Sequence, residues 1–287
     1  IMAEIIIAEH SGFCFGVKRA VDSAYKTAEN SKNKKVYVLG EIIHNPRVVN
    51  ELSNLGVKKI EKLEEIKQPK KSILIIRSHG VSKKILAKSE KLGIEVVDTT
   101  CPFVKKLELL IDELIKENYK IIVLGDKFHP EISSLNDSFD NKLLIVENLE
   151  ELEKLEISKL NRIALLSQTT QSLKKFRDCV NYLVDKCLEL RIFNTICKST
   201  EQRQLSSLEL ARNVDVIFVV GGKNSANTRR LYEICKNINS STYHIEDETE
   251  IKKKYLEGKK KIGITAGAST PQDTINEIVK KLEKMIN

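Results

Sequence analysis

Three cysteines occupy the same kind of position in this sequence, and that repetition restricts the folds open to the chain. Cys14, Cys101 and Cys197 each stand at the end of an apolar, largely β-branched run and directly before an amphipathic helical pattern. The N-terminus of a helix favours the thiolate form of cysteine, which is the form that binds metals. We therefore expect the three cysteines to serve one metal centre.

Each cysteine is followed, at a nearly constant distance, by a strand-like phrase that contains a glycine. The phrases are VYVLGEIIHN, KIIVLGDKFHPE and VIFVVGGKNSAN, and Gly40, Gly125 and Gly221 lie 26, 24 and 24 residues after the preceding cysteine (40−14, 125−101, 221−197). A second buried strand with a small polar turn follows in SILIIRSHGVS, RIALLSQTTQS and KIGITAGASTP. Such a regular order indicates an internal repeat.

The repeat closes on itself, because a last strand leads into the next cysteine and the N-terminal strand EIIIA leads into Cys14. We predict three α/β units, at 14–100, 101–196 and 197–287, the third completed by 1–13. Ile- and Val-rich strands that alternate with helices indicate parallel sheets covered on both faces. Ligands bind beyond the carboxyl ends of such strands. The predicted fold is a trefoil of three pseudo-threefold-related domains, with the cysteines at its centre.

Composition excludes several classes of protein. No apolar run approaches the ~20 residues of a membrane span, and we expect a cytoplasmic protein whose six cysteines are reduced thiols or ligands. The net charge is +8, but lysine is interleaved with glutamate and aromatic residues make up only 5%. Because single-stranded nucleic acid needs a basic cluster with stacking aromatics, we expect no nucleic acid partner. We interpret the excess lysine as belonging to solvated helix faces, with a general bias toward anionic small ligands as the alternative.

The remaining cysteines fall on or beside apolar helical stripes. Cys187 shares a stripe with Phe176 and Leu183, Cys235 falls with Leu231, and Cys179 lies between such positions. We interpret these three as core thiols.

Three thiolates leave one position open in two kinds of metal site. A tetrahedral zinc would hold an activated water there, and a 4Fe-4S cluster would keep one iron free for substrate. The sequence contains no CxxC pair, and its long, even spacings suit a cluster held between domains better than zinc. A protein without metal stays open at this point.

The other strand-end turns carry polar groups that can donate hydrogen bonds to phosphate oxygens. Glu131, at a predicted helix start, is the one carboxylate placed among these turns, and in a water-poor pocket it would be the proton donor. As a first-turn residue it could equally be a structural Glu favoured by the helix dipole. The polar residues at the turns are His44, His79, His129, Ser225, Asn227, Thr169, Thr170 and Ser269.

Taken together, the phrases GFCFGVKRA, GEIIHNPRVV, RSHGVS, DTTCPFV, HPE, SQTTQS, VVGGKNSANTRRL and TAGASTP resemble a known family. It is that of the 4-hydroxy-3-methylbut-2-enyl diphosphate reductases, the LytB-type iron-sulfur oxidoreductases of the methylerythritol phosphate pathway of isoprene biosynthesis. The resemblance runs from Cys14 to Pro271 and keeps the order of the family's motifs.

The resemblance implies a 4Fe-4S cluster with an open iron site, bound by Cys14, Cys101 and Cys197. It also implies that Glu131 and Thr169 act in proton transfer. The reaction would be reductive dehydroxylation of 4-hydroxy-3-methylbut-2-enyl diphosphate to isopentenyl and dimethylallyl diphosphate, with electrons from an acidic carrier such as ferredoxin or flavodoxin. The residues implied to hold the diphosphate are His44, His79, His129, Ser225, Asn227 and Ser269.

Three departures from the family pattern accompany the resemblance. The chain has Ser225-Ala226 where the family usually has two serines, ISSL after HPE where a glycine commonly follows, and STEQRQ in place of TTNRQ after Cys197. Two other functions stay open from the residues: an enzyme that resembles quinolinate synthase, and a metal-free protein that binds a phosphate ligand.

Overall fold

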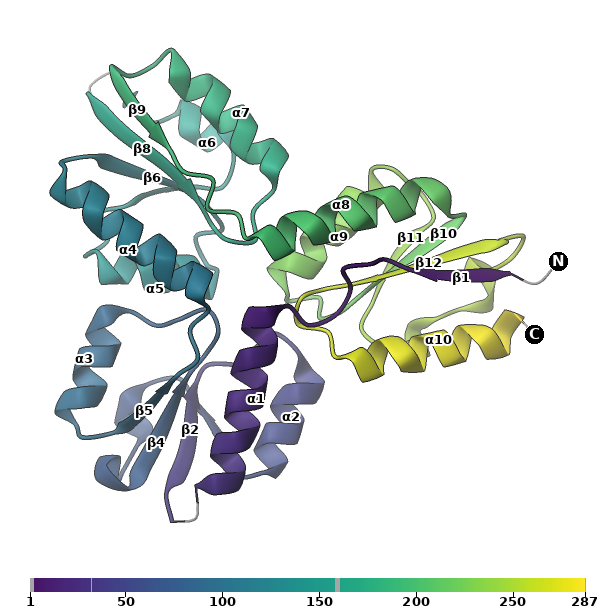
Figure 1. Cartoon of the computed structure of the whole chain (residues 1–287), viewed down its shortest axis with the longest axis horizontal. Coiled ribbons are helices and arrows are strands. Elements are labelled where there is room, and N and C mark those ends of the chain that lie inside the picture. The colour runs from purple at the N-terminus through teal and green to yellow at the C-terminus, as the bar shows by residue number, and fades with distance from the viewer. Residues whose placement is uncertain (1–2, 32, 158–160, 287) are drawn as a thin grey trace. The chain divides into compact units, whose positions relative to one another are not determined.

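The computed structural model describes residues 3–31, 33–157 and 161–286. Within them, the strands form three sheets of four parallel strands each, with helices packed on the sheets (Figure 1). The expected α/β class with small parallel sheets is confirmed. The chain divides into two compact units: Ile1–Lys18, Ile43–Val48 and Lys198–Asn287 form the first, and Arg19–Ile42 and Val49–Cys197 the second.

The first unit contains one sheet in the order β11-β10-β12-β1. Because adjacent residues of a strand point to opposite faces, Val216 and Phe218 pack toward helix α10, whereas Ile217 and Val219 pack toward α8 and α9. Both faces are therefore covered, as the figure also shows for α10 and α8 (Figure 1). The elements are β1 (Glu4–Ile7), α8 (Lys198–Asn213), β10 (Val216–Val220), α9 (Ala226–Lys236), β11 (Thr242–Ile245), β12 (Lys261–Ala266) and α10 (Gln272–Ile286).

The second unit contains the other two sheets, and the first of these has the order β3-β2-β4-β5. The β4 segment is buried along its whole length, as a central parallel strand should be. Helix α1 begins directly after Cys14 in the first unit and continues into the second. The elements are α1 (Phe15–Asn30), β2 (Lys35–Leu39), α2 (Pro46–Asn54), β3 (Lys58–Ile60), β4 (Ser72–Ile76), α3 (Lys83–Lys91) and β5 (Glu95–Asp98).

The remaining sheet of the second unit has the order β7-β6-β8-β9. Ile121 and Val123 face a core shared with α4 and α5, and Ile122 and Leu124 face a core shared with α6 and α7. The elements are α4 (Pro102–Lys116), β6 (Lys120–Leu124), α5 (Pro130–Ser138), β7 (Leu144–Val146), α6 (Leu149–Glu153), β8 (Arg162–Ser167), α7 (Leu173–Val184) and β9 (Glu189–Ile192).

The three sheets share one topology. Strands β5 and β9, each leading toward a cysteine, stand at the edges of their sheets, and β1 holds the same edge beside β12 through parallel pairing from Glu4 with Lys261 to Ile7 with Ile264. The N-terminal strand thus belongs to the sheet built from the C-terminal part of the chain. The division into domains at 14–100, 101–196 and 197–287 with 1–13 stays a prediction.

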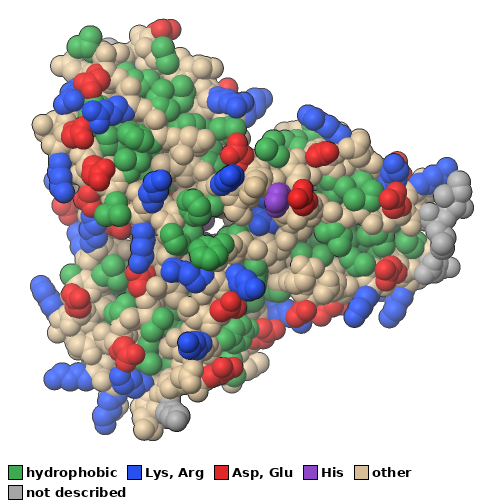
Figure 2. Space-filling view, in the orientation of Figure 1, with side chains coloured by type: hydrophobic (Ala, Val, Ile, Leu, Met, Phe, Trp, Pro, Cys, Tyr) green, Lys and Arg blue, Asp and Glu red, His purple; other side chains and the backbone are tan. Residues whose placement is uncertain are grey.

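The surface carries mixed charge. Figure 2 shows lysine and arginine side chains interspersed with acidic ones over the visible face. Many of them are paired, as in the exposed ion pairs from Lys34 to Glu95 and from Lys83 to Asp112. Among the described residues, no helix is both long and apolar enough to cross a bilayer.

Gly263 provides a test of how tightly the first unit's sheet packs on α8. A Cβ atom at this position would lie 3.0 Å from Val214 Cγ2 and 3.1 Å from Leu210 Cγ. We predict that Gly263→Val lowers the free energy of unfolding by ~1–3 kcal/mol, because the added methyl groups overpack the core. Denaturant unfolding measures this loss. Gly263→Ala should lose less, and equal stability of the valine variant and the parent would contradict the packing.

Candidate active site

The three strand-helix cysteines are held by the same backbone hydrogen bond. The N–H of Cys101 donates to Ser78 O at 2.9 Å, and the N–H of Cys197 donates to Thr169 O at 2.9 Å. In the first unit, the N–H of Cys14 donates to Ala268 O at 3.3 Å. Each accepting carbonyl lies in the turn after the second buried strand of its repeat. Each cysteine directly precedes a helix, which confirms the expected helix starts.

The cysteines separate into two chemical classes. Cys14, Cys101 and Cys197 are half-buried and each directly precedes a helix, so their sulfur atoms fit the role of ligands. In contrast, burial raises the pKa of Cys179 to about 11 and that of Cys235 to about 12. Both are packed in apolar cores, as the sequence predicts, and such thiols do not readily form thiolates.

The half-buried set fits a soft metal centre. Three thiol ligands suit zinc or an iron-sulfur cluster rather than a hard cation such as magnesium. In the first unit, the N–H of Val17 also points to Cys14 Sγ at 3.5 Å, a contact that orients the sulfur at the start of α1.

Glu131 is a buried carboxyl group whose two oxygens both accept hydrogen bonds from Thr169. Its side chain is 2% exposed, its Oε1 accepts the Thr169 N–H at 2.8 Å, and its Oε2 accepts the Thr169 hydroxyl at 2.7 Å. Burial raises the pKa of Glu131, and the two hydrogen bonds from Thr169 oppose that rise. A carboxyl group in this setting holds a proton more readily than an exposed one and can donate it.

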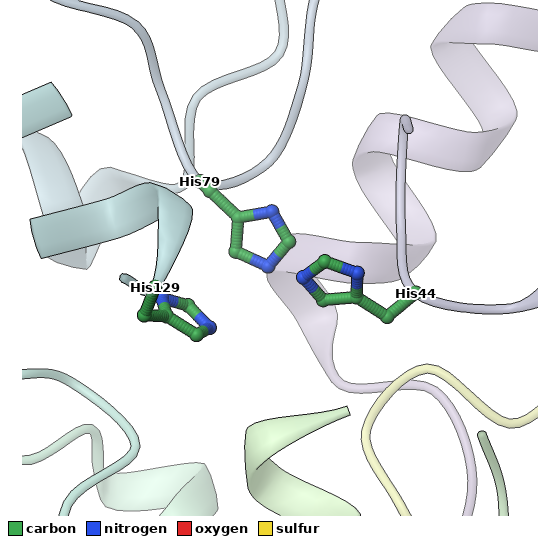
Figure 3. Close-up of side chains that lie close together, drawn as sticks. All are labelled: His44, His79 and His129. Atoms are coloured by element: carbon green, nitrogen blue, oxygen red, sulfur yellow. The ribbon is translucent and has the colours of Figure 1, made fainter. Parts of the chain in front are cut away.

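His129 is the N-cap of α5, and its ring orientation follows from that role. Its Nδ1 accepts the backbone N–H of Glu131 at 3.2 Å, so in the neutral ring Nε2 carries the proton. His79 meets His129 edge to face, with ring centroids 5.2 Å apart. Figure 3 shows these two rings coming from the loop after β4 and from the start of α5. In the second unit, the His129 ring thus contacts the start of α5 at Glu131, and the His79 ring packs against His129.

The first unit gathers a second set of polar residues. Ser225 caps α9, and Ser269 Oγ lies 3.2 Å from His44 O and 3.5 Å from Ser225 Oγ. Asn227 is 5% exposed, and neither its amide nitrogen nor its oxygen has a partner among the described residues. Buried polar atoms normally have partners, so Asn227 indicates a polar ligand.

The loop that carries His44 packs closely on the same unit. A Cβ atom on Gly222 would lie 2.9 Å from His44 O, so only glycine fits there. Asn45 Oδ1 accepts the N–H of Val48, and Arg47 forms an ion pair with Glu277 of α10 at 2.8 Å.

Arg203 is a site residue that the sequence reasoning missed. Its side chain is buried, and Nη1 donates to His10 O at 2.7 Å and to Ala266 O at 3.0 Å. It thereby holds the segment leading to Cys14 against the end of β12. A signal was available, because Arg203 shares the buried stripe of α8 with Ser207 at i+4.

All three departures from the family pattern lie in the first turns of helices. The ISSL segment simply continues α5, whose Ile132 packs where a Cβ on Gly125 would lie, 2.7 Å from Ile132 Cδ1. The STEQRQ segment lies in the first turns of α8, and Ala226 is the first residue of α9.

Comparison with known proteins identifies the family. A family model described as LytB protein matches residues 5–283, so the chain belongs to the LytB family. This confirms the resemblance drawn from the motifs and favours a reductase over the two other functions left open by the sequence.

Similar proteins from other organisms carry the same enzyme name. The chain is 46% identical to the 4-hydroxy-3-methylbut-2-enyl diphosphate reductase of Caldanaerobacter subterraneus subsp. tengcongensis, over 98% of this chain and 97% of the relative. It is 42% identical to the enzyme of the same name from Aquifex aeolicus, over 99% and 97%.

Two solved structures are similar as well. One is described as (E)-4-hydroxy-3-methyl-but-2-enyl diphosphate reductase, the terminal enzyme of the non-mevalonate pathway, with 42% identity, a TM-score of 0.72 and coverage of 99% of this chain and 100% of that one. The other is the E-1-hydroxy-2-methyl-but-2-enyl-4-diphosphate reductase from Plasmodium falciparum, with 28% identity, a TM-score of 0.91 and coverage of 98% and 88%.

The hydroxyl of Thr169 should control the protonation of Glu131. We predict that Thr169→Val raises the pKa of Glu131 further, because the variant removes one of the two hydrogen bonds that favour the carboxylate. Infrared titration of the carboxyl C=O band, assigned with a Glu131→Gln variant, measures this pKa. Thr170→Val is the matched control and should leave it unchanged. A lower pKa in Thr169→Val would contradict the hydrogen-bond assignment.

Proposed function

We propose that this chain catalyses the reductive dehydroxylation of 4-hydroxy-3-methylbut-2-enyl diphosphate to isopentenyl diphosphate and dimethylallyl diphosphate. The observation that carries the proposal is the connected set Glu131, Thr169 and Cys197. A buried carboxyl group is bonded to Thr169, whose carbonyl in turn accepts the N–H of Cys197. The names of the relatives point to the same reaction.

The reaction needs a reductant and an acid together. One C–O bond breaks, one C–H bond forms, and the hydroxyl leaves as water, which consumes two electrons and two protons. A 4Fe-4S cluster bound by Cys14, Cys101 and Cys197, when present, supplies the electrons and a Lewis-acidic iron. Its three half-buried thiols fit this ligand role, and the core thiols do not.

Glu131 is the proposed source of the proton that leaves with the hydroxyl. The carboxyl group passes its proton to Thr169 Oγ1, while the Thr169 hydroxyl passes its own proton to the departing oxygen. For this exchange the Thr169 hydroxyl, which donates to Glu131 Oε2 in the structure, turns toward the departing oxygen and accepts from the protonated carboxyl group across the same 2.7 Å separation. The raised pKa of Glu131 keeps the acid form available.

The diphosphate is proposed to bind to imidazole, hydroxyl and amide side chains. Asn227 has amide atoms without partners among the described residues, and Nε2 of His129 is a donor once Nδ1 accepts from the α5 backbone. With Ala226 in place of a second serine, one hydroxyl contact is lost, at a cost of about 1 kcal/mol of binding free energy. The six proposed contacts are His44, His79, His129, Ser225, Asn227 and Ser269.

Electrons are proposed to come from a small acidic carrier such as ferredoxin or flavodoxin. The net charge of +8 supports this, since complementary charge speeds encounter between electron-transfer partners. The cytoplasm is the proposed location of the enzyme and fits the proposed pathway. Among the described residues, no helix is long and apolar enough to cross a membrane.

The decisive experiment is anaerobic. The full chain is reconstituted with iron and sulfide, mixed with reduced viologen dye, and given 4-hydroxy-3-methylbut-2-enyl diphosphate. Dye oxidation with formation of both diphosphate products supports the proposal. A reconstituted protein that leaves the dye reduced would refute this substrate.

We predict that Glu131→Gln binds the cluster normally and loses turnover by about 10²-fold or more, because the proton donor is gone. Dye oxidation and iron content measure the two properties. Normal turnover would remove Glu131 from the mechanism.

The stability of this variant distinguishes lost chemistry from lost folding. Because the folded-state pKa of Glu131 is raised, the stabilisation from its bound proton is lost as pH rises through that value. Above that pH, Glu131→Gln should therefore unfold at the same temperature as the parent or at a higher one.

We predict that Cys197→Ser fails to retain a full cluster, because a hydroxyl is a poor ligand for iron in place of a thiolate. Iron and sulfide analysis after anaerobic reconstitution measures the loss. Cys187→Ser is the matched control, since Cys187 packs at the edge of an apolar core and should leave iron content unchanged. A full iron complement in Cys197→Ser would disprove the ligand role.

A further inference from the structure

The second unit contains a partly open cavity of about 230 Å³ beside α3, α4 and α5, and Glu131 is one of the residues that line it. Glu131, in its wall, is 2% exposed, whereas Leu109, also in its wall, is 63% exposed. The volume of the cavity leaves room for several water molecules. A buried proton donor therefore adjoins a solvent-connected space.

A row of hydroxyl groups follows the cavity along α5. Glu131, Ser134 and Ser138 are spaced i, i+3 and i+7, which places them on one face of the helix, and all three line the cavity. Ser134 Oγ lies 3.4 Å from Gly80 O and keeps lone pairs that can accept from water. Ser134 is therefore placed, one turn from Glu131, to pass a proton along.

A second carboxylate, Glu108 of α4, also lines the cavity. Glu108 Oε1 is buried and has no hydrogen-bond partner among the described residues. Lys105 and Asp98, also in the wall, form an ion pair at 2.5 Å. A buried carboxylate oxygen without a protein partner needs water to satisfy it, so Glu108 indicates that the cavity is wet.

The rest of the wall is mainly apolar. Val81, Val104 and Leu135 are buried there and offer no proton acceptor. Water in the cavity can therefore transfer a proton only to the few polar side chains that line it.

The proposed reaction makes such a route necessary. Glu131 gives up a proton in each turnover and must regain one, yet its side chain has almost no contact with bulk water. Both of its carboxylate oxygens accept hydrogen bonds from Thr169, the residue through which the proposed proton transfer runs.

We propose that this cavity is the proton inlet of Glu131. Water inside it carries protons from solvent, with Glu108 collecting them and the Ser134 hydroxyl relaying them to Glu131. The route returns the proton that Glu131 loses, and the electrons of the reaction come separately from the external reductant. This inference rests on the proposed function.

The test is the rate at which the Glu131 carboxyl proton exchanges for deuterium. Rapid mixing of the full, reconstituted chain into D2O, at a pH at which Glu131 is protonated, shifts its C=O infrared band, which Glu131→Gln identifies. We expect Ser134→Val and Glu108→Gln each to slow this exchange about tenfold, the change that an added barrier of one relay step would cause.

Each variant has a matched control on its own helix. Ser133→Val changes an exposed serine of α5 that lies outside the cavity wall, and Glu113→Gln changes an exposed glutamate of α4. Both controls should exchange at the parental rate. Parental rates in both cavity variants, or equal slowing in the controls, would overturn the proposal.

A second readout separates this proposal from the proposed function. If the parent does not dehydroxylate the substrate, the function fails, while the exchange rates still decide whether the cavity supplies Glu131. If the parent is active, Ser134→Val and Glu108→Gln should lower turnover with little change in KM. A change confined to KM would count against a proton route.

Discussion

The hydrogen bond from each cysteine N–H to a strand-end carbonyl is the constraint on which the proposed site depends. Ser78, Thr169 and Ala268 supply these carbonyls. In two of the three turns the next residue, His79 or Ser269, is a proposed substrate contact, and in the third Thr169 itself is the proposed proton relay. One backbone bond therefore fixes a thiol and a substrate-binding side chain to the same strand end. Sheets hold such positions more rigidly than free loops do, which a cluster and its substrate both require.

The acid of the site depends on two opposed effects. Burial disfavours the charge of Glu131, and the hydrogen bonds from Thr169 favour it. Neither effect alone would suit a proton donor: an unsupported buried carboxyl would hold its proton too tightly, and an exposed one would lose it to water. His129 adds to the arrangement, since it caps the helix at the Glu131 N–H and leaves its other nitrogen as a donor.

Much of the fold and of the site could be predicted from the sequence, because both rest on local patterns. The position of Cys14, Cys101 and Cys197 before helices, and the apolar strands before the polar turns, are readable residue by residue. What depends on packing could not be predicted. The bond from Thr169 to Glu131 spans 38 residues, and the buried role of Arg203 is hidden by its charge. The cavity is lined by helices that pack on two different sheets, so no single sequence motif predicts it.

The ISSL segment after Glu131 shows how a local departure can add a function without disturbing a site. Ile132 fills the space over Gly125, so α5 continues without a break and Glu131 keeps its place in the first turn. A helix that continues also fixes what comes one turn later. Ser134 must then lie on the same face as Glu131, beside the cavity, where a glycine turn would have offered neither the hydroxyl nor the fixed direction. This departure from the family pattern thus places the proposed relay hydroxyl one turn from the proposed acid.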